Sequence, residues 1–262
     1  MIHDMRAAYR EALLRCDPPM ARLRYPLVLF DAGDTLVAPR ESFGAVYARV
    51  LRTLGVTLPA ADLERGLRLC WAETNRALEP GVDRYAMGGA GENAYWLRFV
   101  AGTLARTPGA PRDEAFAASA LAPLREAFRD PESWRVFDDV VPVLSALRDA
   151  GARLAIVSNW DSGLPTLLER LGLASWFDTI VVSHLEGVEK PKPELFLRAV
   201  ARLGGRPAEA LHVGDVPELD GAGATAAGIA SVIIDRRRRL SAEQAAHPDL
   251  STVPGIAQNG GI

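Results

Sequence analysis

Short apolar segments alternating with stretches of helical length constrain the fold of this 262-residue chain more than any other feature. Beyond residue 136, helical stretches separate four segments that have the composition of strands, namely RLAIVS, TIVVS, ALHVGD and ASVIID. Strands that are apolar throughout and separated by helices indicate βαβ units, with helices covering both faces of a parallel sheet. The sequence therefore predicts an α/β core.

The first strand of this core is separated from the others by a long helical stretch. YPLVLFD predicts a strand at about 26 to 31, ending in an aspartate. From Ser42 to about Arg129 the periodicity is helical and broken by Gly and Pro, which predicts an inserted bundle of about four helices. The expected division of the chain is an N-terminal helical arm at 1–24, a core at 25–38 and 136–240, a helical insertion at 39–135, and a C-terminal tail at 241–262.

Composition and charge exclude two classes of function. The net charge is -3, and the basic run RRRRL at 236–240 has no interleaved aromatic residues, so we expect a solvated loop and no nucleic-acid partner. No apolar run approaches the roughly 20 residues that span a bilayer, and the N-terminus lacks a signal-peptide core. The expectation is a cytoplasmic protein without a membrane partner.

Polar residues follow the predicted strands. Asp31 ends the first strand, Ser158 and Asn159 end RLAIVS, and Asp215 ends ALHVGD, with Asp220 five residues on. Lys190 lies in the loop EGVEKPKPE, and it and Lys192 are the only lysines among 30 basic residues. Because ligands bind beyond the carboxyl ends of parallel strands, these residues predict a site at that edge of the sheet.

The residue types at this edge suit phosphoryl chemistry. Carboxylates brought together could hold Mg²⁺, which prefers oxygen ligands. A serine hydroxyl, a lysine ammonium and backbone N–H groups would bind phosphate oxygens. An aspartate beside such groups is a plausible nucleophile, forming an aspartyl-phosphate that water later hydrolyses.

Four ordered motifs, FDAGDTLV, VSN, EKPKPELF and HVGDVPELDGAGATAAG, closely resemble those of the haloacid dehalogenase (HAD) superfamily from about Tyr25 to Asp235. The run SWRVFDDVVPVLSALRDAG resembles the branch of haloacid dehalogenase-like hydrolase domain proteins. The resemblance implies a Rossmann-like core with a helical cap inserted after the first motif. It also implies a Mg²⁺-dependent phosphatase, monomeric or homodimeric, acting on a small phosphorylated metabolite.

The resemblance also assigns the metal site. It implies that Asp31 is both the nucleophile and a Mg²⁺ ligand, and that the backbone carbonyl of Gly33 completes the metal site from the first motif. Asp215 would bind Mg²⁺ directly or through water, and Asp220 would support that site.

The substrate-binding residues follow from the same motifs. Ser158, assisted by the backbone of Asn159, would bind the phosphoryl group, and Lys190 would neutralise the charge of nucleophile and phosphate. Thr35, counted with these residues, would orient the first loop. Two further candidates for lining the pocket are His184 and Trp160.

One position departs from the pattern of the phosphatases, which usually read DxDxT. Gly33 stands where the second aspartate would protonate the leaving group, and Asp34 comes one residue later. Asp34 is either a replacement acid or a turn residue. The alternatives to a phosphatase are therefore a 2-haloacid dehalogenase-like hydrolase, which needs no metal, and a weakly active or non-catalytic binding protein.

Overall fold

The computed structural model describes residues 23–79, 81–85, 91–241 and 246–261. The arm predicted at 1–24 lies almost entirely outside these residues. Among the helices that are described, none has both the length and the apolar character needed to cross a bilayer.

A six-stranded parallel sheet forms the core, in the order β5-β4-β1-β6-β7-β8. Its strands are β1 (Leu27–Phe30), β4 (Arg153–Ser158), β5 (Thr179–Val182), β6 (Ala210–Gly214), β7 (Ala230–Ile234) and β8 (Ala246–His247). Residues of β1, β4 and β6 are buried almost throughout, as expected of central strands covered on both faces. The predicted Rossmann-like α/β core is confirmed.

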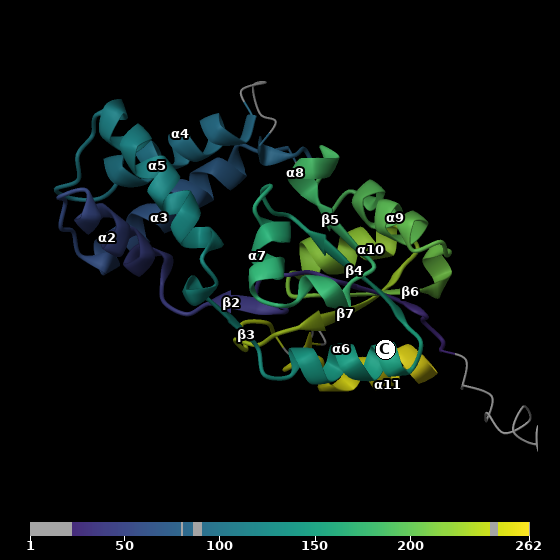
Figure 1. Ribbon diagram of the computed structural model, residues 1–262. Coiled ribbons are helices and arrows are strands. Elements are labelled where there is room, and N and C mark those ends of the chain that lie inside the picture. The colour runs from purple at the N-terminus through teal and green to yellow at the C-terminus, as the bar shows by residue number, and fades with distance from the viewer. Residues whose placement is uncertain (1–22, 80, 86–90, 242–245, 262) are drawn as a thin grey trace, which may run out of the picture.

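Helices pack on both faces of this sheet (Figure 1). Val28 and Phe30 point into a cluster shared with one set of helices, α6 (Val140–Asp149), α7 (Leu164–Arg170) and α11 (Val253–Asn259). Leu27 and Leu29 point to the other face, toward α9 (Pro193–Arg202) and α10 (Ala222–Ala226). This period-two division of β1 gives the core two apolar layers. The shorter turns are α8 (Ser183–Glu186), η2 (Pro131–Ser133), η3 (Ala174–Trp176), η4 (Pro207–Glu209), η5 (Pro217–Gly221) and η7 (Leu250–Thr252).

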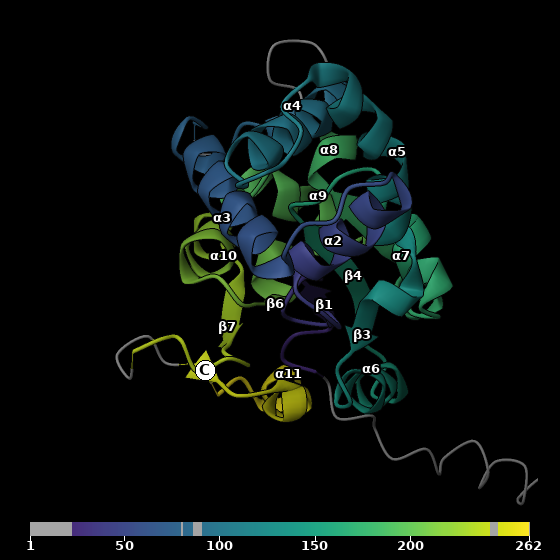
Figure 2. The same cartoon turned by 90° about the vertical axis from the view of Figure 1, so that its left-hand side faces the viewer.

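The helical insertion forms a second lobe, called the cap below, above the sheet (Figures 1 and 2). It is entered and left through an antiparallel ribbon of β2 (Val37–Pro39) and β3 (Trp134–Val136). In the described residues its helices are α2 (Phe43–Thr53), α3 (Ala60–Arg76), α4 (Gly91–Ala105) and α5 (Glu114–Arg129). They enclose an apolar cluster of their own, so the cap packs as a unit.

The C-terminal segment is not the tail that the sequence predicts for 241–262. β8 adds a parallel strand beside β7, and α11 packs against α6 at the lower edge of the core (Figures 1 and 2). Leu250 and Val253 are fully buried there. The helix is only seven residues long and carries a proline and a glycine, so its sequence shows too little periodicity to predict it. Its packing on α6 decides its structure.

This correction makes a prediction about stability. Leu250→Ala should lower the free energy of unfolding by about 2–5 kcal/mol, because a fully buried leucine is removed from a packed core. Leu185→Ala, at a position of α8 that is 57% exposed, should change it by less than about 0.5 kcal/mol. Urea unfolding monitored by circular dichroism measures both, and a loss for Leu250→Ala as small as that expected of the exposed leucine would show that the C-terminal segment is not part of the core.

Candidate active site

Three adjacent strands bring the predicted residues to one edge of the sheet. Asp31 follows β1, Ser158 is the last residue of β4, and Asp215 follows β6. Since β1 lies between β4 and β6 and all three run in the same direction, their carboxyl ends meet. The residues predicted for the site therefore lie together at the carboxyl edge, and the cap stands over this side of the core (Figure 1).

Lys190 lies at the centre of the site. Its side chain is 3% exposed, and Nζ donates to Asp31 Oδ1 at 2.7 Å and to Asp220 Oδ1 at 2.6 Å. Burial alone would lower the pKa of Lys190, but the charges of Asp220 and Asp31 outweigh it and raise that pKa above its ordinary value. The ammonium is thus held charged between two carboxylates, as a neutralising group must be.

Asp31, Asp215 and Asp220 form an acidic cluster. One ligand oxygen from each lies within 4.8 Å of the others. Burial raises the pKa of Asp31 although Lys190 opposes the shift. Burial, together with the negative charges of Asp31, Asp220 and Asp34, raises the pKa of Asp215 to about 8. Crowding carboxylates in this way is unfavourable unless a cation joins them, so the cluster has the character of a cation site.

Asp220 is the most firmly held member of the cluster. Besides Lys190, it contacts His212 Nε2 through Oδ1 at 2.8 Å and accepts the Val216 N–H at 3.0 Å through Oδ2. Burial would raise the pKa of Asp220, but Lys190 and His212 hold it well below its ordinary value. His212 lies within the buried strand β6, and it meets Asp220 only because η5 folds back toward β6, so no local sequence pattern predicts this contact.

Asn159 acts through its side chain. Its Oδ1 accepts the Lys190 N–H at 2.7 Å, and its Nδ2 donates to the Lys190 carbonyl at 3.0 Å. These two hydrogen bonds to one residue fix the backbone that carries the Lys190 side chain. The buried hydroxyl of Ser158 lies close enough to Asp31 for a hydrogen bond that lowers the pKa of that carboxyl. The part of the prediction that assigns the Asn159 backbone to phosphate stays a prediction.

The first loop is anchored by the arginines that follow β7. The Thr35 carbonyl accepts hydrogen bonds from Arg236 Nε at 2.9 Å and Nη2 at 2.7 Å, while the Thr35 hydroxyl is fully buried. Arg236 also pairs with Asp139 Oδ1 at 3.0 Å. The segment expected to be a solvated basic loop therefore includes one arginine that is 9% exposed and holds the loop of Asp31 in place.

Asp34 is turned toward the same arginines. Its Oδ1 pairs with Arg237 at 2.5 Å and its Oδ2 with Arg239 at 3.1 Å, and its backbone has a positive φ of 51°. Both carboxylate oxygens are thus engaged by guanidinium groups, and the backbone has the left-handed conformation that aspartate tolerates in turns. This geometry favours the turn residue over the replacement acid.

The Trp160 ring leaves little space for an aspartate side chain at position 33. A Cβ at Gly33 would lie 3.3 Å from the Trp160 ring, which is tighter than an ordinary contact. Trp160 in turn packs on Trp134, with ring centroids 5.2 Å apart. Trp160 therefore lies over the first loop and covers Gly33. The role of the Gly33 carbonyl as a metal ligand stays a prediction.

The fold and this site define a capped α/β enzyme with an acidic centre. The chain belongs to the haloacid dehalogenase-like hydrolases, since the model of that family matches residues 25–228. The mouse haloacid dehalogenase-like hydrolase domain-containing protein 3 is 32% identical over 213 residues, covering 81% of this chain and 83% of its own. A phosphoserine phosphatase from Thermus thermophilus is 33% identical, covering 86% and 94%.

A solved structure agrees with the fold. A putative HAD hydrolase from Bacillus subtilis, bound to magnesium, matches with a TM-score of 0.68 at 22% identity, covering 89% of this chain and 99% of that one. At this identity the likeness concerns the fold alone. The predicted superfamily and the prediction of a hydrolase are confirmed.

Proposed function

We propose that this hydrolase is a cytoplasmic, Mg²⁺-dependent phosphatase that acts on a small phosphorylated metabolite. The observation that carries the proposal is the buried Lys190 ammonium held between Asp31 and Asp220, next to Asp215. A nucleophilic carboxylate, a neutralising cation and an acidic cluster at one sheet edge are the parts that phosphoryl transfer to an aspartate needs. The similarity to a phosphatase supports the same reaction class.

The acidic cluster fits Mg²⁺ in its donor set. Carboxylate oxygens suit this ion, and three carboxylates within 4.8 Å provide them. Because Lys190, His212 and the Val216 N–H already engage the oxygens of Asp220, we assign the metal to Asp31 and Asp215, with Asp220 as the support of the site. Bound there, Mg²⁺ would offset negative charge on the phosphoryl oxygens.

The side chains of this site perform the two steps of the proposed reaction. A carboxylate oxygen of Asp31 attacks phosphorus, the bond from phosphorus to the substrate oxygen breaks, and the phosphoryl group passes to Asp31. The leaving oxygen takes a proton from solvent. Water then attacks phosphorus and loses a proton to solvent, the bond from phosphorus to the Asp31 oxygen breaks, and the carboxylate returns as inorganic phosphate is released. Lys190 keeps the Asp31 oxygen oriented at 2.7 Å and offsets the charge, and the Ser158 hydroxyl binds a phosphoryl oxygen.

The two alternatives predict different chemistry. A metal-independent dehalogenase does not need three carboxylates whose ligand oxygens lie within 4.8 Å of one another, so the geometry favours the phosphatase. A dehalogenase would release halide from a 2-haloacid without added metal. A binding protein would shift in melting temperature with Mg²⁺ and phosphate esters but would release no phosphate.

Removal of the metal tests the proposal. In a panel of phosphate monoesters, EDTA should lower phosphate release at least about 100-fold, because several kcal/mol of charge stabilisation are lost. Added Mg²⁺ should restore the rate, and Asp215→Asn should raise the Mg²⁺ concentration needed for half-maximal activity. Phosphate release that is unaffected by EDTA would contradict the assignment of the cluster to a metal.

A further inference from the structure

A segment of the cap lies directly against the loop that carries Lys190. Val82 forms an antiparallel bridge with Val188, and the Glu189 N–H donates to the Gly81 carbonyl at 3.3 Å. Residues 81–85 come between α3 and α4 of the cap, whereas 188–190 connect α8 to α9 of the core. The two lobes therefore share a backbone contact one residue away from Lys190.

A buried ion pair reinforces this contact. Arg84 Nε donates to Glu189 Oε2 at 3.0 Å and Nη2 donates to Oε1 at 3.1 Å, and the two side chains are 10% and 6% exposed. This bidentate geometry fixes direction as well as distance. Burial lowers the pKa of Arg84, but Glu189 more than compensates and raises it.

Arg84 is also fixed on the cap side. Its Nη1 donates to Asn75 Oδ1 at 3.2 Å, and its guanidinium lies 5.0 Å from the Trp71 ring centroid. Both partners belong to α3. The guanidinium is therefore a rigid part of the cap that reaches the core, and not a flexible surface arginine.

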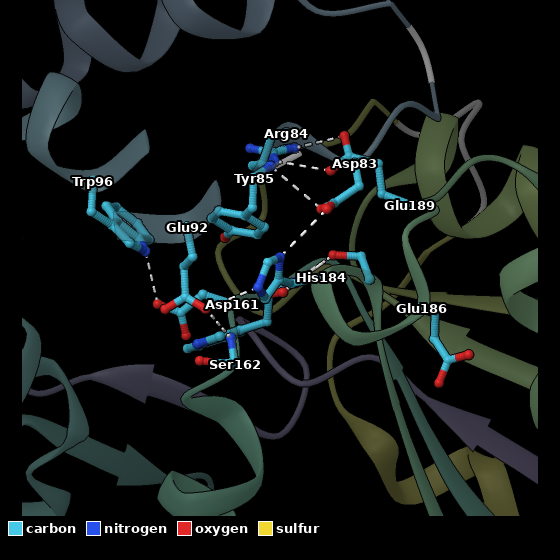
Figure 3. A network of polar contacts seen from close by, with 12 residues as sticks. Asp83, Arg84, Tyr85, Glu92, Trp96, Asp161, Ser162, His184, Glu186 and Glu189 are labelled. Atoms are coloured by element: carbon cyan, nitrogen blue, oxygen red, sulfur yellow. Dashed lines mark hydrogen bonds and ion pairs between the residues drawn. The ribbon is translucent and has the colours of Figure 1, made fainter. Parts of the chain in front are cut away.

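Other polar contacts across the same boundary surround this pair (Figure 3). His184 of α8 lies between two carboxylates of the cap, with Nδ1 3.4 Å from Asp83 Oδ2 and Nε2 3.2 Å from Glu92 Oε2. The Trp96 indole donates to Asp161 Oδ2 at 2.9 Å. These contacts dock the cap on the core, but among the pairs drawn it is Arg84–Glu189 that contacts the neighbour of Lys190.

The Lys190 loop is thus held from two sides. Asn159 of the core binds the Lys190 backbone through two hydrogen bonds, and Arg84 of the cap binds the adjacent Glu189. We infer that Arg84 is a positioning residue. While the cap is docked, its ion pair with Glu189 holds the loop so that Lys190 Nζ contacts Asp31, and undocking of the cap releases this hold. The inference rests on the proposed function for its turnover readout. It makes the chemical step depend on the position of the cap.

The test compares four proteins with the parent. Arg84→Met removes the guanidinium, Glu189→Leu removes the carboxylate, and the double variant replaces the whole pair by apolar side chains, which avoids an unpaired buried charge. Arg106→Met is the matched control, since in the described part of the chain Arg106 bonds to Glu73 and to the Gly102 carbonyl, both inside the cap. Each protein is assayed for kcat and KM with p-nitrophenyl phosphate and for thermal unfolding.

A second readout does not depend on turnover. Hydrogen exchange of the amides at 188–190 reports whether the loop is held, because Glu189 N–H bonds to the cap and Lys190 N–H to Asn159. We expect faster exchange in Arg84→Met and in the double variant, and parental exchange in Arg106→Met. This readout decides the inference even if the parent turns over no phosphate ester, which would instead overturn the proposed function.

The expected kinetic result is a loss confined to kcat. Arg84→Met and the double variant should lose about 10- to 100-fold in kcat with KM changed by less than about twofold, since a misplaced lysine disturbs the chemical step. The double variant should nevertheless unfold close to the parental temperature. If the double variant regains parental kcat together with stability, or if exchange at 188–190 matches that of Arg106→Met, Arg84 has only a structural role and the inference is wrong.

Discussion

Replacing Asp31 with asparagine is expected to lower turnover by roughly 10⁴- to 10⁶-fold, the scale on which removing a covalent nucleophile acts. The amide has the shape of the carboxylate but is a far weaker nucleophile, and its oxygen can still accept the hydrogen bond from Lys190. The measurement is phosphate release in a steady-state assay, with mass spectrometry of the protein after substrate addition to detect the phosphorylated aspartate. Retained activity would show that the phosphoryl group never passes to Asp31.

The fold should survive this substitution. The pKa of Asp31 is raised above its ordinary value of 3.8, chiefly by burial. A carboxyl with a raised folded-state pKa contributes stability at low pH that is lost as pH rises through that pKa, so burial favours the neutral form of Asp31, which an amide resembles. Because Asp220 still pairs with the Lys190 ammonium in the variant, the Asp31→Asn protein should unfold close to the parental temperature. A large decrease would mean that lost activity reflects lost structure.

Asp34→Asn is the matched control, because it makes the same chemical change three residues away. Both oxygens of Asp34 pair with Arg237 and Arg239, so this variant should keep activity within a few-fold of the parent. A loss comparable to that of Asp31→Asn would assign Asp34 to the chemistry after all.

The strand ends could be predicted from the sequence because buried parallel strands leave a readable pattern. Asp31, Ser158 and Asp215 each end an apolar run, and a parallel sheet must bring such ends together. Lys190 could be identified because it and Lys192 are the only lysines of the chain and because it lies in the loop EGVEKPKPE. In the structure its Nζ donates to Asp31 Oδ1 at 2.7 Å. These features depend on local pattern and on the rules of one sheet topology.

The contacts that orient those residues could not be predicted in this way. Arg84 and Glu189 are 105 residues apart and join the cap to the core, whereas Asp34 and Arg237 are 203 residues apart and join two loops of the core. Neither pair exists before the chain has folded. The two hydrogen bonds from the Asn159 side chain to the Lys190 backbone join residues that are 31 positions apart. α11 has no periodicity of its own. In each case the deciding interaction is tertiary, and no neighbouring residue signals it.

The second large effect concerns the leaving group. We expect kcat/KM for an activated aryl ester such as p-nitrophenyl phosphate to exceed that for an alkyl ester such as glycerol phosphate by about 10²- to 10⁴-fold, the usual value of general acid catalysis. Gly33 supplies no acid, and Asp34 is held by two arginines. Burial raises the pKa of Asp215, but Asp215 supplies no acid in the enzyme with its metal bound, because a divalent cation favours the ionised carboxylate.

Restoring the acid should reduce this preference. Gly33→Asp alone meets the Trp160 ring, 3.3 Å from the added Cβ, so its side chain is crowded. Gly33→Asp combined with Trp160→Leu gives the carboxyl room and should raise the rate on the alkyl ester more than the rate on the aryl ester. Trp160→Leu alone is the control for the lost ring. Equal kcat/KM for both esters in the parent would instead mean that another group already protonates the leaving oxygen, and the space over Gly33 would then have no bearing on the chemistry.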